Sequence, residues 1–453
     1  MQPGARRAGA GILYPVREMR SALESYFQFR ELGTDWRTEV LAGCTTFVTM
    51  AYIIFVNPSI LGEAGMPQQA VTAATCLASA IGCFLMGALA RYPIALAPGM
   101  GLNAYFTYTV CLGLGVPWQT ALGAVFLSGL TFLLLIAAGI RQLILESIPR
   151  ELYSAVAVGI GLFIALIGMR NAGIIQASPA TMVTLGNLRD PKTLLALGGL
   201  LLICALLVRG IRAAMLIGIL ATTAAGAAFG FFDWTPQTYS PKALGATWLA
   251  MDVRGALNLG LLEIIFVFLF VDVFDNVGTL VAVGTRAGLI GKDGRIPRVN
   301  RILASAAAAS SAGAACGTST VVSYIESAAG VVAGGRSGVT AIVCGLLFLA
   351  ALVVAPLFGA VPAQATAPAL IVVGALMLVH TEEIEWTKPA SSIPAFLTLA
   401  AIPMTFSIAN GLAFGFTAHT LLRVLAGEWR RVHWLVYLLT ALFLLRFFYL
   451  GQG

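Results

Sequence analysis

Residues 97–104 of this chain read APGMGLNA, and they interrupt the apolar segment 94–113. A proline and two glycines so close together break an α-helix, which predicts a short extended piece followed by a half-helix. A second apolar segment, 317–333, opens with a similar break, because residues 316–326 read CGTSTVVSYIE. Glycine followed by β-branched, hydroxyl-bearing residues favours extended backbone. Two broken segments of the same kind indicate a repeated architecture.

The composition identifies the environment of these segments. Charged residues make up 10% of the chain and hydrophobic residues 59%, whereas an average soluble domain has about 25% charged residues. The chain is therefore expected to be an all-α polytopic membrane protein. Spans of roughly 20 residues predict about fourteen transmembrane segments, at 37–57, 68–90, 94–113, 117–140, 150–169, 192–208, 213–232, 258–284, 300–316, 317–333, 338–356, 364–380, 392–408 and 410–426.

The broken segments are the third and the tenth span, so each is the third span of its half. A half with seven spans ends on the opposite side of the membrane from where it began, which predicts a 7+7 inverted repeat. The expected divisions are an N-terminal segment 1–35, a first repeat 36–232, an extracytoplasmic loop 233–257, a second repeat 258–427 and an apolar C-terminal tail 428–453. The tail either spans the membrane or lies at its surface.

The basic residues predict the orientation. With fourteen spans and a cytoplasmic N-terminus, most of the 27 lysines and arginines fall in cytoplasmic segments, as the positive-inside rule requires. The net charge of +7 then reflects orientation and anionic lipid, and it indicates no nucleic-acid partner. The scattered cysteines and histidines form no metal site, and no cofactor is expected. We expect a multi-pass protein of the cell (inner) membrane.

Three carboxylates lie inside predicted spans: Asp272 and Asp275 in the eighth, and Glu326 in the tenth. A charge at bilayer depth costs at least about 2.5 kcal/mol, so such residues are functional candidates by default. No lysine or arginine within spans eight or ten could pair with them. A carboxylate in this position can bind and release a proton, as a proton-coupled symporter requires.

The polar groups of the broken spans are expected to face these carboxylates. Asn103 follows the break in span three, and Thr318 and Ser319 lie in the break of span ten. Half-helix N-termini at the midplane would add backbone N–H donors, and Phe268 and Phe274 could supply aromatic walls. Carboxylates, backbone donors and phenyl rings together suit a flat heteroaromatic ring and disfavour an anion.

Four motifs carry a resemblance to a known family. They are TMAYIIFVNP at 49–58, APGMGLNAYF at 97–106, FVDVFD at 270–275 and YIESAAG at 324–330. With them the chain resembles the AzgA-like purine permeases of the nucleobase–cation symporter 2 (nucleobase–ascorbate transporter) superfamily, from about residue 29 to residue 427. The resemblance implies a core domain of spans 1–4 and 8–11 and a gate domain of spans 5–7 and 12–14. It also implies proton-coupled import of adenine, guanine or hypoxanthine, and a homodimer.

The resemblance implies roles for individual residues. Asp272 and Glu326 would hold the base, while Asn103 and the backbone near Gly101 and Leu102 would line the site. Asp275 would tune substrate affinity or join Asp272 and Glu326 in proton coupling. The hydroxyls of Thr318 and Ser319 and the ring of Phe268 complete the predicted binding site.

Other functions fit the sequence less well. An anion carrier of the sulfate-permease kind shares the inverted-repeat architecture, but it should have a neutral or basic site. An intramembrane aspartyl protease needs two aspartates on separate helices, whereas Asp272 and Asp275 are one turn apart on a single helix. A channel would need a pore-lining ring or a filter motif, and neither is apparent. The sequence does not choose between adenine and the 6-oxopurines.

Overall fold

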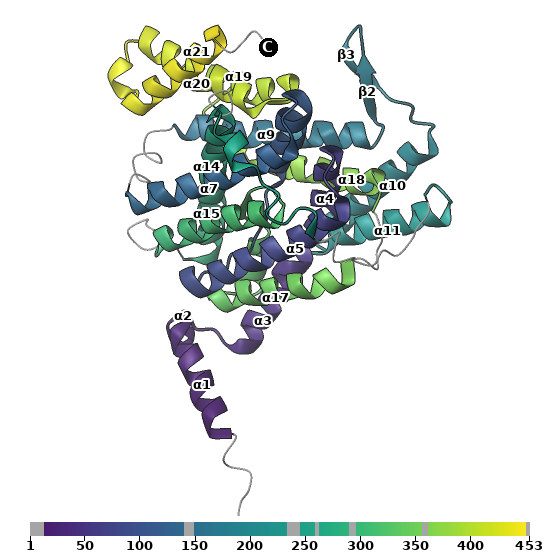
Figure 1. The fold of residues 1–453 in the computed structure, drawn as a ribbon, viewed down its shortest axis with the longest axis vertical. Coiled ribbons are helices and arrows are strands. Elements are labelled where there is room, and N and C mark those ends of the chain that lie inside the picture. The colour runs from purple at the N-terminus through teal and green to yellow at the C-terminus, as the bar shows by residue number, and fades with distance from the viewer. Residues whose placement is uncertain are drawn as a thin grey trace, which may run out of the picture.

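The computed structural model of the chain describes residues 13–139, 149–232, 245–258, 262–289, 296–355 and 361–449. Helices make up most of it (Figure 1). In the first half the elements are α1 (Leu13–Tyr26), α2 (Phe29–Leu32), α3 (Trp36–Met50), α4 (Ile53–Glu63), α5 (Gln68–Leu85), η1 (Met86–Ala90), β1 (Leu96–Pro98), α6 (Met100–Ala104), η2 (Tyr105–Gly113), α7 (Trp118–Ala137), α9 (Arg150–Asn171), β2 (Ile175–Ser178), β3 (Met182–Leu185), α10 (Pro191–Val208) and α11 (Ala214–Ala228).

The second half begins with the short α13 and ends with a helix beyond the predicted repeat. Its elements are α13 (Val253–Ala256), α14 (Leu262–Ala287), α15 (Val299–Cys316), β4 (Val321–Ser323), α16 (Ser327–Val332), α17 (Gly338–Val354), α18 (Ala363–Met377), η5 (Leu378–Glu383), α19 (Pro389–Thr405), α20 (Ile408–Leu425), η6 (Trp429–Arg431) and α21 (Trp434–Tyr449).

Each predicted span corresponds to a helix or to a broken helix in the described residues. Within these residues, 7 helices are long and apolar enough to cross a membrane by themselves, and shorter apolar helices include α11, α17 and α19. The expected all-α membrane architecture is confirmed. Residues 233–244 of the predicted extracytoplasmic loop lie outside the described residues.

The two broken spans meet through their extended pieces. β1 and β4 pair in antiparallel fashion, with Leu96 opposite Ser323 and Pro98 opposite Val321. The pairing continues beyond Pro98, because the Gly99 amide donates to the Thr320 carbonyl at 2.9 Å. A Cβ at Gly99 would lie 2.8 Å from Cγ2 of Val322, so glycine permits this close approach. The pairing satisfies backbone polar groups that would otherwise be unpaired at membrane depth.

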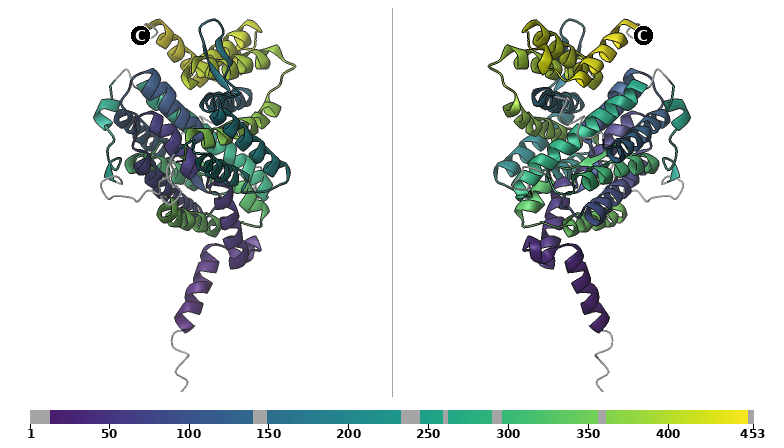
Figure 2. Two further views of the ribbon diagram at one scale, coloured as in Figure 1. Left: turned by 90° about the vertical axis from the view of Figure 1, so that its right-hand side faces the viewer. Right: turned by 90° about the vertical axis from the view of Figure 1, so that its left-hand side faces the viewer.

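The helices pack in two groups. One group contains α3 to α7 and α14 to α17, which pack on one another around β1 and β4; we call it the core group. The other contains α9 to α11 and α18 to α20 with η5, and we call it the gate group. Figure 1 shows α9 and α18 beside the core group, and Figure 2 shows the same arrangement from two sides. The assignment of these groups as separately moving domains stays a prediction.

Peripheral elements extend beyond the bundle. The N-terminal helix α1 projects away from it, and the β2–β3 hairpin projects near α10 (Figure 1). The predicted apolar tail forms α21, which packs on α20. Phe443 of α21 also contacts Phe266 of α14, with 6.0 Å between the ring centroids.

One buried carboxylate anchors the start of the first span to the eleventh. Glu39 of α3 is fully buried, and its Oε1 accepts hydrogen bonds from the amides of Arg336 and Ser337 at 2.9 and 3.1 Å. Its Oε2 accepts from the amide and the hydroxyl of Thr340 at 3.2 and 2.6 Å. The carboxylate thereby satisfies amides at the N-terminus of α17, where the helix dipole also favours negative charge.

Candidate functional site

A cavity lies at the boundary between the two groups of helices. The core group contributes residues of α6, α14 and the segment after β4, and the gate group contributes residues of α9, α18 and η5. Its lining consists of Gly101, Leu102, Phe270, Val271, Phe274, Asp275, Thr279 and Ile325 on the core side and of Tyr153, Val156, Ala157, Ile160, Met377 and His380 on the gate side. The cavity is therefore apolar for most of its surface, with a few polar groups, as is typical of small-molecule sites.

Asp275 is the carboxylate that lines this cavity. Its side chain makes no hydrogen bond with any other described residue, and it is close enough to Glu326 for the two carboxylates to interact electrostatically. Glu326 follows the cavity-lining Ile325, and its Oε1 accepts a hydrogen bond from the Tyr52 hydroxyl at 2.6 Å. Among the described residues, no lysine or arginine pairs with either carboxylate.

Asp272 lies one turn away on α14 but is directed into the core group. It is fully buried, and its two carboxylate oxygens accept hydrogen bonds from Asn276 Nδ2 at 2.7 Å and from the Ser310 hydroxyl at 3.0 Å. Asn276 Oδ1 in turn accepts from the amide of Ser323 at 2.9 Å. Asp272 therefore orients Asn276, and Asn276 fixes β4. Direct contact of Asp272 with a substrate stays a prediction of the sequence.

Asn103 belongs to a second buried network. Its Nδ2 donates to Oδ1 of Asn57 at 2.7 Å, and its Oδ1 accepts from the Ser319 hydroxyl. Asn57 Nδ2 donates to the hydroxyls of Thr75 and Thr318 at 2.7 and 2.8 Å. All five residues are fully buried. The structure thus brings Asn103, Thr318 and Ser319 together around Asn57, apart from the residues that line the cavity, and their contact with a substrate stays a prediction of the sequence.

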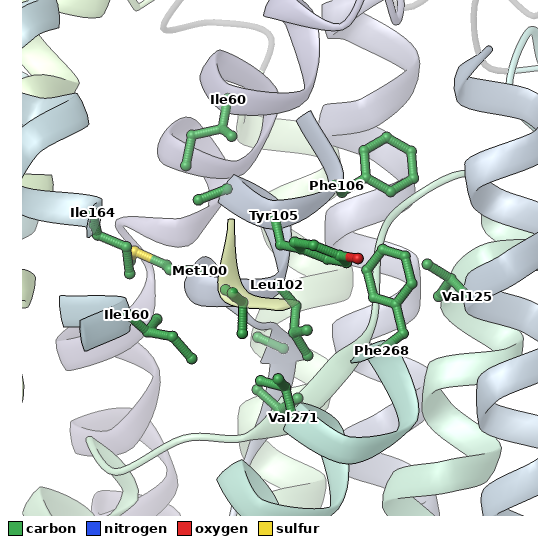
Figure 3. Close-up of a cluster of buried hydrophobic side chains, with 14 of the residues drawn as sticks. Ile60, Met100, Leu102, Tyr105, Phe106, Val125, Ile160, Ile164, Phe268 and Val271 are labelled. Carbon is green, nitrogen blue, oxygen red and sulfur yellow. The ribbon is translucent and has the colours of Figure 1, made fainter. Parts of the chain in front are cut away.

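The aromatic residues divide in the same way. Phe268 is fully buried and packs against Tyr105 and Phe106, at centroid distances of 5.1 and 6.4 Å (Figure 3). The rings that line the cavity are Phe270, Phe274 and Tyr153. Phe274 lies between the other two, 4.6 Å from Phe270 and 5.4 Å from Tyr153. These three rings form a continuous aromatic wall, of which the sequence predicted only Phe274.

Gly101 and Ile160 lie close together where α6 approaches α9, because a Cβ at Gly101 would lie 2.4 Å from Cγ2 of Ile160. Leu102 and Gly101 belong to the first turn of α6, directly after the extended β1. The first amides of a helix have no acceptor within the helix, so they are available to a bound ligand. This part of the predicted site, the backbone near Gly101, borders the cavity.

A polar contact away from the cavity joins the core group to the gate group. Glu63, the last residue of α4, accepts hydrogen bonds from the Tyr108 hydroxyl at 2.8 Å and from Asn171 Nδ2 at 3.0 Å. It also forms an ion pair of 3.1 Å with Arg170 of α9, whose guanidinium lies 5.1 Å from the centre of the Tyr108 ring. The predicted topology places this contact on the outer side of the membrane.

Comparison with known proteins identifies the class of this chain. The profile of a permease family matches residues 37–414, which include both broken spans and all three carboxylates. The chain belongs to the nucleobase–ascorbate transporter family of permeases. The resemblance drawn from the sequence motifs is confirmed, and the chain is a membrane transporter and not an enzyme.

Individual relatives support the assignment along the whole chain. The guanine/hypoxanthine permease PbuG of Bacillus subtilis is 45% identical over 442 residues, covering 94% of this chain and 100% of the relative. The adenine permease AdeP of Escherichia coli is 43% identical over 424 residues, covering 94% of this chain and 95% of the relative. Among solved structures, the transmembrane domain of a cyanobacterium bicarbonate transporter, BicA, matches 84% of this chain and 97% of its own with a TM-score of 0.61 at 16% identity. That likeness shows the fold, which confirms the 7+7 architecture.

Sequence reasoning did not find Tyr52, Tyr153 or Asn57. Tyr52 and Asn57 lie within the motif TMAYIIFVNP, so their place in that motif was the available signal. Tyr153 lies outside the four motifs, and only packing of α9 against α14 brings it to the cavity.

Proposed function

We propose that this permease imports purine nucleobases with protons and that the base binds in the cavity between the two groups of helices. The observation that supports this most is the combination of the Asp275 carboxylate with the wall formed by Phe270, Phe274 and Tyr153. An aromatic wall suits a planar ring, and a carboxylate without a basic partner suits a ligand with N–H donors. The names of the guanine/hypoxanthine and adenine permease relatives support the same substrate class.

The substrate contacts in this proposal follow the cavity. Asp275 accepts hydrogen bonds from adjacent N–H groups of the base, and the amides of Gly101 and Leu102 donate to an acceptor of the base. Glu326, held by Tyr52, contributes a second carboxylate beside Asp275. Neither carboxylate has a lysine or arginine partner among the described residues, and a single proton shared by the two would remove their repulsion. The proposal therefore assigns proton coupling to Asp275 and Glu326.

Asp272 has a different role in this proposal. It holds Asn276 and thereby the strand that precedes Glu326, so it acts on the site through β4. Its part in proton coupling, like the homodimer, the inner-membrane location and the cytoplasmic N-terminus, stays a prediction of the sequence.

An acidic cavity argues against the alternative of an anion transporter. The likeness to a bicarbonate transporter at 16% identity concerns the fold only. An anion would meet the charge of Asp275 without a compensating lysine or arginine among the described lining residues.

The proposal is tested by uptake of radiolabelled purines into cells that lack their own purine permeases. We expect saturable uptake of adenine, guanine or hypoxanthine that a protonophore abolishes. Asp275→Asn and Glu326→Gln should each raise KM by about tenfold to a hundredfold, because each removes a charge-assisted hydrogen bond worth about 1.5–3 kcal/mol. Asp190→Asn, which changes an aspartate before α10 and away from the cavity, is the matched control.

Wild-type cells without saturable purine uptake would refute the proposed function. Normal uptake by both Asp275→Asn and Glu326→Gln, at wild-type amounts of protein in the membrane, would instead refute the proposed site. Asp272→Asn is expected to lower the maximal rate through displacement of β4.

A further inference from the structure

Helix α9 presents one face to the cavity. Tyr153, Val156, Ala157 and Ile160 all line it, and their spacing of three, four and seven residues places them on the same side of an α-helix. This face belongs to the gate group, whereas Asp275 belongs to the core group. The cavity is therefore complete only where the two groups are in contact.

This face of α9 packs against two glycines of the core group. A Cβ at Gly101 would lie 2.4 Å from Cγ2 of Ile160, and a Cβ at Gly278 would lie 1.4 Å from the hydroxyl oxygen of Tyr153. Real Cβ atoms do not come so close to their neighbours, so a larger residue at either position would displace the side chain of Ile160 or Tyr153. The Tyr153 hydroxyl thus rests directly on the backbone of α14, one turn from Asp275.

The Tyr153 hydroxyl has no hydrogen-bond partner among the residues that the structure describes, although its ring is packed against Phe274 at 5.4 Å. Tyr153 is half-buried, and a phenol hydroxyl in such a place normally finds a hydrogen-bond partner in protein, water or ligand. Here the side chain lines the cavity, and Asp275 is close enough for electrostatic interaction. A ligand beside Asp275 would come within reach of this hydroxyl.

We propose that Tyr153 is the residue with which the gate group binds the purine, its ring forming the end of the aromatic wall and its hydroxyl donating to a ring nitrogen of the base. The inference rests on the proposed function. Asp275 takes the N–H edge of the base, and Tyr153 takes an unprotonated ring nitrogen from the opposite side of the group boundary. Binding across this boundary draws the gate group toward the core group. Gly278 has no side chain and therefore allows the Tyr153 hydroxyl to contact the backbone of α14.

The first test is Tyr153→Phe, which keeps the ring and its contact with Phe274 but removes the hydroxyl. Loss of one neutral hydrogen bond should raise KM for the purine about threefold to tenfold with an unchanged maximal rate. Tyr437→Phe is the matched control, because the Tyr437 hydroxyl donates to the Trp429 carbonyl at 2.9 Å on α21, outside the cavity. An unchanged KM for every purine in Tyr153→Phe, with normal wild-type uptake, refutes the inference and leaves the proposed function intact.

The second test identifies the atom that Tyr153 binds. Purines in which one ring nitrogen is replaced by C–H are used as competitors of uptake. The analogue that lacks the bonded nitrogen should inhibit the wild type about threefold to tenfold less than the parent base does, and should inhibit wild type and Tyr153→Phe equally. If each analogue loses the same affinity in both proteins, Tyr153 makes no such bond.

The third test concerns the contact between Gly278 of α14 and the Tyr153 hydroxyl. Gly278→Ala should reduce uptake strongly, and addition of Tyr153→Phe should restore part of it, because the atom closest to the new Cβ is then removed. Gly198→Ala in α10 is the control, since nothing lies within 4 Å of a Cβ at that position. Additive losses in the double variant contradict the proposed contact. Absence of purine uptake by the wild type would instead refute the proposed function, so the two failures are distinguishable.

Discussion

Replacement of Glu39 by alanine should destabilise the protein far more than replacement of an ordinary surface glutamate. The carboxylate accepts three backbone amides of residues 336, 337 and 340 and two hydroxyls, those of Thr34 and Thr340. In Glu39→Ala the three amides lose their acceptor at a fully buried site. Each unsatisfied buried group costs about 1–3 kcal/mol, and partial repair by nearby groups leaves an expected loss of about 3–5 kcal/mol.

The assay is thermal unfolding of the purified protein in detergent. A loss of this size corresponds to a decrease in Tm of about 5–10 °C for a chain of several hundred residues. Glu39→Gln keeps one acceptor oxygen but turns an amide group toward the N-terminus of α17, so its Tm should lie between those of Glu39→Ala and the wild type. Glu18→Ala, at an exposed position of α1, is the matched control. A Tm of Glu39→Ala within about 2 °C of the wild type would refute the anchoring role.

Three further predictions follow from other contacts. Glu63→Gln should weaken the outer contact with α9 by about 1 kcal/mol. A cysteine introduced as Ser59→Cys should then react about fivefold faster with a membrane-impermeant maleimide than the same cysteine does beside the native Glu63. Equal reaction rates in the two backgrounds would contradict this. Gly317→Ala should lower Tm by several degrees more than Gly210→Ala, because both glycines have positive φ, of 98° and 73°, but only the Cβ at Gly317 collides with a neighbour, Cβ of Thr247 at 2.2 Å. Asn57→Ala should lower Tm by about 5 °C through loss of three buried hydrogen bonds, and a variant as stable as the wild type would exclude a structural role for that network.

The span pattern could be predicted from the sequence because it depends on local properties. Apolar length and the positions of glycine and proline place the helices, and the break at residues 97–104 appears as β1 followed by α6. The antiparallel pairing of β1 with β4 was beyond local reasoning, since it joins residues more than two hundred positions apart. The same holds for Glu39, which lies within the predicted first span and whose partners come from the loop before α17.

The carboxylates show the limit of reasoning from a helix face. Residues three apart on a helix are separated by about 60° around its axis, so helix geometry alone assigns Asp272 and Asp275 to the same face. That angle is nevertheless large enough to direct Asp272 to Ser310 inside the core group and Asp275 to the cavity. The sequence gives the helix but not its rotation relative to its neighbours, and this rotation decides which carboxylate can meet a ligand.

The position of Asp275 has a consequence for how transport can be coupled to the substrate. The hydrogen-bond partners of Asp272 lie on α14 and α15, both of the core group, so separation of the two groups of helices leaves these hydrogen bonds in place. Asp275 lies at the boundary, where one wall of the cavity belongs to each group. Any relative movement of the groups changes the solvation of Asp275 and its distance from Tyr153. In the proposed mechanism a group that exchanges both substrate and protons undergoes such a change between the two sides of the membrane, and of the two aspartates only Asp275 lines the boundary cavity where it would occur.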